Sequence, residues 1–253
     1  MNQSLNSIKY GDVFKLGNHL LICGDARDKE LITKLVGTHK IKAVVIDPPY
    51  GIAVTESKRD FQALAKDKVI TNDHIQSDAE YKKFSADWMN AITPHLERKN
   101  SFYIFNADKM VFALRDGMLE AGLKFAQLLI WVKTHAVVGR LDYAPQHELI
   151  AYGWFGTHEF VKGKDKSVLV YPKPNKSSMH PTTKPIPLIR HLILNSTRVG
   201  DVVYDAFLGS GTTLLACEQT KRICLGVEFD PEYCQTIIDR FEKLSGIKAE
   251  RYE

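Results

Sequence analysis

The chain has 253 residues, of which 44% are hydrophobic and 25% are charged, close to the averages of folded globular domains. This apolar share excludes intrinsic disorder because it suffices for a substantial core, and no apolar run approaches the ~18 residues of a membrane-spanning helix. The net charge of +4, from 34 basic and 30 acidic residues, allows a nucleic-acid partner without requiring one.

The first part of the chain alternates predicted strands with predicted helices, which is typical of an α/β fold with a largely parallel sheet. Gly17 and Asn18 separate two short strands and favour a hairpin turn between them. Asp28 is the expected N-cap of a helix that runs to Val36. The elements expected next are a buried strand at 43–46, an amphipathic helix at 77–96 and a strand at 101–105.

The alternation continues to the end of the chain, but two irregular segments interrupt it. Residues 51–75 are polar and lack periodicity, which predicts a mobile loop, and residues 133–180 are expected to form a lysine-containing surface insertion. The insertion is short for a separate domain, so residues 1–253 are predicted to form a single domain. The remaining expected elements are a helix at 108–120, strands at 124–132 and 147–152, a helix at 186–195, a strand at 201–205, a helix at 212–221, a strand at 222–228 and a helix at 231–244.

The four cysteines form no C-x-x-C pair and have no histidines at zinc-finger spacing. Cys23 and Cys224 lie in apolar runs, which predicts buried structural thiols and no metal site. Free thiols fit a reducing compartment, and the polar N-terminus lacks a signal-peptide pattern. We therefore expect a cytoplasmic protein.

Tyr50 ends the tetrapeptide Asp47-Pro48-Pro49-Tyr50, which directly follows the buried strand at 43–46. Two consecutive prolines force the chain to turn and stiffen its backbone, so that carbonyl oxygens point outward. Asp47 offers a carboxylate acceptor, and Tyr50 offers an aromatic face on which a planar base can stack. Two acceptors beside a stacking ring suit an exocyclic amine of a nucleobase, whereas the structural alternative is a rigid turn with an exposed tyrosine.

A glycine-containing segment, residues 205–213, follows the strand at 201–205 and opens a helix. Glycines let the backbone approach a ligand closely, and a helix N-terminus favours negative charge. The next strand ends at Glu228, whose carboxylate can accept hydrogen bonds from both hydroxyls of a ribose. This unit predicts an adenosine-containing ligand. Leu214 stands where the dinucleotide motif G-x-G-x-x-G has its third glycine, which disfavours a nicotinamide cofactor.

With these motifs the sequence resembles the DNA amino-methyltransferases, which transfer a methyl group from S-adenosyl-L-methionine to adenine N6 or cytosine N4. The resemblance extends from Gly11 to Gly246 and includes D-P-P-Y at 47–50, D-x-F-x-G-S-G-T-T at 205–213 with Ala206 in place of the usual proline, and H-P-T-T-K-P at 180–185. The catalytic motif precedes the cofactor motif, as in the circularly permuted β group. The resemblance implies a Rossmann-like methyltransferase fold, with a mixed, mostly parallel seven-stranded sheet and helices on both faces.

The same resemblance implies a set of site residues. The catalytic residues would be Asp47, Pro48, Pro49 and Tyr50. Asp25 would face the adenine amine of the cofactor, Glu228 its ribose and Lys184 its methionine carboxylate. The full set implied for the cofactor is Asp25, Ala26, Lys184, Asp205, Phe207, Gly209, Ser210, Gly211, Thr212, Thr213, Glu228 and Phe229.

The partner implied is double-stranded DNA with its target base flipped out, because a duplex hides the amine. Candidate DNA contacts are Lys133, Arg140, Gln146, His147, Lys162 and Lys164. The D-P-P-Y form is more typical of adenine N6 than of cytosine N4, so a site-specific adenine methyltransferase is expected, with the cytosine-N4 enzyme as the alternative. An RNA methyltransferase and a non-catalytic nucleic-acid-binding module are further alternatives. The resemblance also suggests a homodimer and leaves a cognate restriction endonuclease open as a partner.

Overall fold

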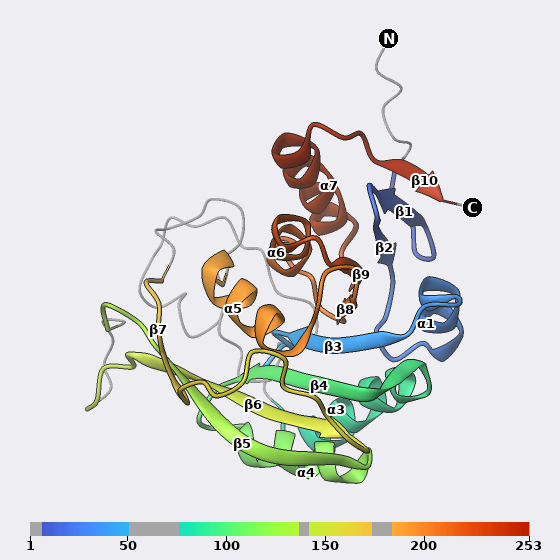
Figure 1. Ribbon diagram of the computed structural model, residues 1–253. Helices are drawn as coiled ribbons and strands as arrows, with labels where there is room; N and C mark the ends of the chain where they lie inside the picture. Colours follow the sequence, from blue (N-terminus) through green and yellow to red (C-terminus); the bar gives the residue numbers. More distant parts are fainter. Residues whose placement is uncertain (1–6, 51–75, 137–141, 174–183, 253) are drawn as a thin grey trace.

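The strands form one mixed sheet with helices on both faces, as Figure 1 shows. The computed structural model describes residues 7–50, 76–136, 142–173 and 184–252, so the expected loop at 51–75 lies outside the described residues. In spatial order the sheet runs β10-β1-β2-β9-β8-β3-β4-β6-β5-β7. In chain order the strands are β1 (Val13–Leu16), β2 (His19–Cys23), β3 (Ile41–Ile46), β4 (Leu96–Asn106), β5 (Leu123–Val132), β6 (His147–Phe155), β7 (Val168–Val170), β8 (Val202–Asp205), β9 (Ile223–Glu228) and β10 (Glu250–Tyr252).

The described sheet has ten strands rather than the seven that the resemblance implied. β2, β9, β8, β3 and β4 are mutually parallel, and β6 runs antiparallel between β4 and β5. Three short strands extend this centre. β1 pairs with β2, and the three-residue edge strands pair at the two ends of the sheet, β10 with β1 and β7 with β5. The expectation of an α/β fold with a mixed, mostly parallel sheet is confirmed.

The helices begin largely where the sequence places caps. Asp28 accepts hydrogen bonds from the amides of Glu30 and Leu31, and Ser77 forms a capping box with Glu80. The helix expected at 77–96 ends earlier, because Pro94 lies in a short 3₁₀ turn after which β4 begins. The helical elements are α1 (Lys29–Val36), α3 (Asp78–Ile92), η1 (Thr93–His95), α4 (Val111–Glu120), α5 (Ile186–Ser196), α6 (Thr212–Thr220) and α7 (Pro231–Ser245).

The sheet separates two apolar cores. One packs the sheet against α1, α3 and α4 and includes Trp88; the other packs it against α5, α6 and α7 and includes Trp131. All four cysteines are buried and free, which confirms the predicted burial of the Cys23 and Cys224 thiols. None of the helices in the described ranges is long and apolar enough to cross a membrane.

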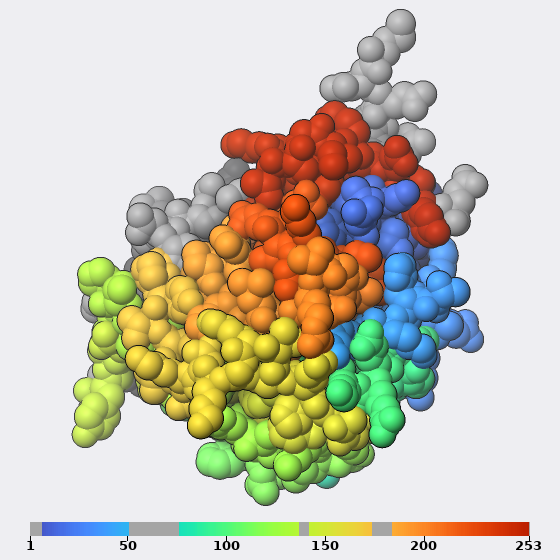
Figure 2. Space-filling view, in the orientation of Figure 1, coloured from blue at the N-terminus to red at the C-terminus, as the bar shows by residue number. Residues whose placement is uncertain are grey.

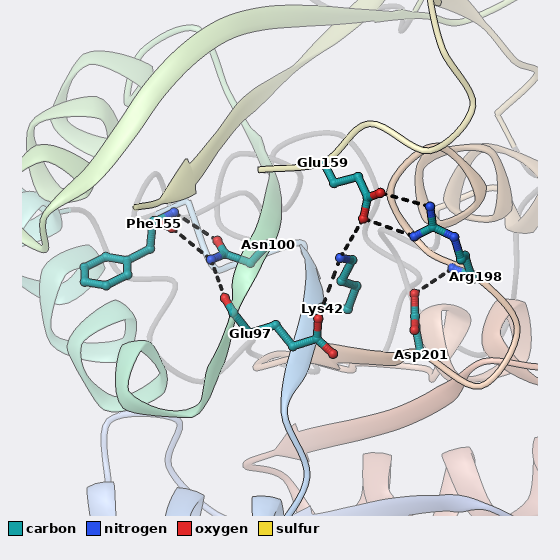
Figure 3. Close-up of polar contacts among 7 residues, drawn as sticks. All are labelled: Lys42, Glu97, Asn100, Phe155, Glu159, Arg198 and Asp201. Carbon is teal, nitrogen blue, oxygen red and sulfur yellow. Dashed lines mark hydrogen bonds and ion pairs between the residues drawn. The ribbon is translucent and has the colours of Figure 1, made fainter. Parts of the chain in front are cut away.

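An ion-pair network around the buried Lys42 connects several elements at the edge where the parallel strands begin (Figure 3). Lys42, near the start of β3, is 5% exposed, and its Nζ lies 3.2 Å from Glu159 Oε2 and 3.6 Å from Glu97 Oε2. Arg198 adds two hydrogen bonds to the Glu159 carboxylate, at 2.9 and 3.0 Å. Because Glu159 follows β6, this network holds the chain after β6 at the edge opposite the carboxyl ends of β3 and β8.

The carboxyl ends of four neighbouring strands bring four acidic residues to one edge. Asp25 follows β2, Glu228 ends β9, Asp205 ends β8 and Asp47 follows β3. These strands are parallel neighbours: β2 pairs with β9, β9 with β8 and β8 with β3. Ligands of open α/β sheets bind at this edge, so it defines the candidate site.

Candidate active site

Both carboxylate oxygens of Asp47 are already bonded within the described chain. The Tyr50 hydroxyl donates to Oδ1 at 2.7 Å, and the Lys184 ammonium donates to Oδ2 at 2.5 Å. Lys184 also lies over the Tyr50 ring, with Nζ 5.6 Å from the ring centroid. The carboxylate and the phenol of the turn at the end of β3 therefore lie beside a cation that precedes α5.

Lys184 and Asp47 belong to a longer chain of alternating charges. Lys184 Nζ lies 3.2 Å from Glu148 Oε2, and Glu148 Oε1 lies 2.8 Å from Lys133 Nζ. The two lysines are 5–6% exposed, so their charges need these partners. The sequence did not predict this row of alternating charges. The resemblance implied that Lys184 binds a cofactor carboxylate, and Glu148 had no expected role.

The charge chain fixes the ionisation of its members. Burial by itself would raise the pKa of Glu148, but the ammonium groups of Lys184 and Lys133 outweigh burial and lower this pKa to about 2. Burial lowers the pKa of Lys184, but Asp47 and Glu148 outweigh it, and the net pKa is raised. Burial raises the pKa of Asp47, a rise that Lys184 limits.

The glycine loop folds over the end of β9. The amide of Gly209 donates to Glu228 Oε2 at 2.7 Å, and the amide of Asp230 donates to Oε1 at 2.9 Å. Gly211, with φ of +83°, occupies the left-handed region as the N-cap of α6, a conformation that glycine adopts without strain. Asp205 Oδ1 accepts from the amide of Phe207 at 3.0 Å. The loop thus holds both carboxyl groups in fixed positions.

The two carboxyl groups of this loop carry strongly shifted pKa values. Burial raises the pKa of Asp205 to about 7, against hydrogen bonds from Thr213 and the amide of Phe207. Burial likewise raises the pKa of Glu228 to about 7, against its two backbone amides. Carboxyl groups desolvated at strand ends are acceptors suited to hydroxyl and amine donors of a ligand, so these residues fit an adenosyl group.

The other residues assigned to the cofactor are placed less uniformly. Ser210, Thr212 and Thr213 are buried in the same loop and first turn of α6. Ala26 is also buried, and Phe229 is 45% exposed directly after Glu228. Asp25 is at the expected edge, but its carboxylate is held by Arg27, whose Nη2 lies 2.7 Å from Oδ2. Burial by itself would raise the pKa of Asp25, but the hydrogen bonds from Arg27 outweigh burial, and the net pKa is lowered.

Three of the proposed DNA contacts lie apart from the exposed surface beside Asp47. Lys133 is 5% exposed and paired with Glu148, so it does not face solvent as a phosphate contact would. The backbone amide of Lys162 donates to Asn195 O at the carboxyl end of α5, so Lys162 and nearby Lys164 lie at the edge opposite Asp47. Figure 2 shows this yellow segment packed against the orange surface of the region around α5.

Two other proposed DNA contacts lie beside the catalytic motif. Gln146 and His147 are exposed at the start of β6, immediately before Glu148. Gln146 also bonds the backbone of Lys133, which holds the end of the β5–β6 hairpin closed. Arg140 and residues 180–183 of the H-P-T-T-K-P motif lie outside the described residues.

Comparisons with known proteins agree with one another. The family model described as DNA methylase, for N6 and N4 methyltransferases, matches residues 41–239. The chain is 25% identical to the Type II methyltransferase M.HpaI of Haemophilus parainfluenzae over 88% of this chain and 74% of that one. Among solved structures, the M1.HpyAVI–SAM complex has a TM-score of 0.64 at 24% identity, covering 87% of this chain and 98% of that one. The PvuII cytosine-N4-specific DNA methyltransferase has a TM-score of 0.71 at 18% identity, covering 90% and 87%.

Proposed function

This chain belongs to the DNA methylase family of N6 and N4 methyltransferases, and we propose that it methylates the N6 amine of adenine in duplex DNA at a short specific sequence. The cofactor of this family is S-adenosyl-L-methionine. The observation that carries the proposal is the intact D-P-P-Y turn, with Asp47 at the carboxyl end of β3 and next to the strand that leads into the glycine loop. The target base must leave the helix to reach Asp47.

The chemistry assigned to Asp47 follows from the target amine. Its lone pair is delocalised into the base, which makes the nitrogen a poor nucleophile. Hydrogen bonds from its two N–H groups, to the Asp47 carboxylate and the Pro48 carbonyl, favour a tetrahedral nitrogen and localise the lone pair. Fixed acceptors and in-line positioning then supply the acceleration. Tyr50 provides the face on which the flipped base stacks.

The cofactor assignments rest on the carboxyl groups of the glycine loop. Glu228 would bind the ribose hydroxyls and Asp205 would line the same pocket, because both lie beside the loop at 205–213. When bound, the cofactor supplies an electrophilic sulfonium methyl group. Asp25 now bonds Arg27 and Lys184 bonds Asp47, so the adenine amine and the cofactor carboxylate would add to these bonds or replace them.

Adenine is favoured over cytosine because the D-P-P-Y form of the motif is more typical of adenine N6, whereas the serine form is more typical of cytosine N4. Cytosine N4 is the second candidate, because a solved relative named as cytosine-N4-specific shares the fold. For DNA contacts we retain Gln146 and His147, which are exposed beside Glu148. A homodimer and a cognate restriction endonuclease complete the proposal and are testable by mass photometry and by genomic neighbourhood.

The test is incubation of the protein with methyl-labelled S-adenosyl-L-methionine and unmethylated DNA, followed by nucleoside analysis. N6-methyladenine supports the proposal, N4-methylcytosine supports the second candidate, and label in neither base refutes both.

Asp47→Asn should lower transfer by about 100-fold or more while cofactor affinity by equilibrium dialysis stays near wild type. Asp116→Asn, on the exposed surface of α4, is the matched control. Full activity of Asp47→Asn would refute the role of this carboxylate.

A further inference from the structure

Glu148 is a carboxylate that the proposed transfer leaves without a role, although it lies in contact with the catalytic turn. Its Oε2 is 3.2 Å from Lys184 Nζ and 3.4 Å from the Tyr50 hydroxyl oxygen. Its Oε1 is 2.8 Å from Lys133 Nζ. The side chain is 20% exposed and comes from β6, the antiparallel neighbour of β4, so it approaches Asp47 from a different part of the sheet.

The bonds of Asp47 create a requirement that Glu148 can meet. Tyr50 bonds one Asp47 oxygen and Lys184 the other, so a target amine that takes the place of Lys184 leaves this cation in need of another partner. Lys184 is 6% exposed, and moving a cation from a buried pair without a second partner is costly. Among the described residues, Glu148 is the other carboxylate in ion-pair distance of Lys184.

We propose that Glu148 is a positioning residue, which keeps Lys184 in place and carries its charge when Asp47 exchanges the lysine for the target amine. The inference rests on the proposed methyl transfer and extends it. Lys133 serves this arrangement by anchoring Oε1, so that Glu148 can hold Lys184 with Oε2 without moving. The net charge of these four side chains is zero before and after the exchange, because two carboxylates balance two ammonium groups in both arrangements.

The ionisation states agree with this geometry. The low pKa of Glu148, about 2, keeps its carboxylate charged at any pH at which the enzyme would work. The raised pKa of Lys184 keeps its ammonium charged in the same range. Glu148 contributes to that raised pKa, so removing its charge should lower the pKa of Lys184.

The alternative is that Glu148 only neutralises two buried lysines, and a pair of variants separates the two roles. Glu148→Gln should lower kcat by at least 10-fold, leave the Kd of S-adenosyl-L-methionine within twofold, and move the alkaline limb of the kcat profile to lower pH. Lys133→Met with Glu148→Gln removes one charge of each sign and should recover the Tm lost by Glu148→Gln, but not its kcat. Recovery of both kcat and Tm in the double variant would overturn the proposal.

A second measurement separates this inference from the proposed function. Competitive labelling with acetic anhydride, read by peptide mass spectrometry, reports the reactivity of the Lys184 amine without any methyl transfer. Glu148→Gln should make Lys184 at least threefold more reactive at pH 8, and unchanged reactivity would overturn the role of Glu148. Absence of transfer by the wild-type protein would instead overturn the proposed function, whatever the labelling shows.

Discussion

Replacing Glu228 with glutamine should flatten the pH dependence of the free energy of unfolding. Glu228 is 9% exposed, and burial raises its pKa from the ordinary 4.5 to about 7. Between these two values the folded chain binds more protons at this group than the unfolded chain does. Its contribution to stability is therefore complete below pH 4.5 and is lost as the pH rises through 7.

The magnitude follows from the pKa values. A rise from 4.5 to about 7 corresponds to about 3 kcal/mol at 1.36 kcal/mol per pH unit. The wild-type protein should lose about that amount from this one group between pH 4.5 and pH 8, and Glu228→Gln should not. The difference between the two pH values is the quantity to compare, because glutamine keeps only one of the two oxygens that accept from Gly209 and Asp230.

The assay is urea denaturation of wild type and Glu228→Gln at several pH values from 4.5 to 8, without cofactor. Asp116→Asn, whose side chain is 54% exposed, is the control and should follow the wild-type curve. If Glu228→Gln loses as much stability as the wild type between these limits, the carboxyl group is not held protonated by burial. Glu228 would then not be a desolvated acceptor at the end of β9.

Three further variants test the packing and the placement of the surface lysines. Gly153→Ala should lower the free energy of unfolding by about 3 kcal/mol, because its Cβ would lie 1.9 Å from the carbonyl oxygen of Lys124; a Tm equal to wild type would contradict this contact. Asp28→Ala should cost about 1 kcal/mol through loss of the α1 cap, measured by thermal denaturation, and no loss would show that the cap is redundant. Lys162→Ala with Lys164→Ala should leave the Kd for DNA within twofold in fluorescence anisotropy, because both lie opposite the catalytic edge; a strong loss would place DNA on that edge too.

Local sequence signals sufficed for most of the fold. Asp28 caps its helix as expected, and the apolar strands followed by acidic residues align at one edge. Short edge strands such as β10 could not be predicted, because three exposed residues carry no periodicity and pair only after the sheet has formed. The polar start of β4 was missed for a similar reason: its residues face solvent before the strand becomes apolar.

The sequence can locate those parts of the candidate site whose functional groups all lie in one contiguous segment. The turn from Asp47 to Tyr50 and the glycine loop are contiguous, so residue type and spacing identify them. The pairing of Glu148 with Lys184 and Lys133 is not contiguous. It depends on the antiparallel direction of β6, which brings the beginning of that strand, rather than its end, to the catalytic edge.

The antiparallel β5–β6 hairpin fixes both ends of the segment that connects its two strands. Val132 pairs with His147, and the amide of Lys133 donates to Gln146 O at 2.8 Å, so the hairpin closes just before the connecting segment. Both ends of that segment are fixed at the catalytic edge by backbone bonds that do not depend on its length or composition. The pairing of β5 with β6 up to Lys133 and Gln146 is therefore set by the two strands themselves and not by the segment that connects them.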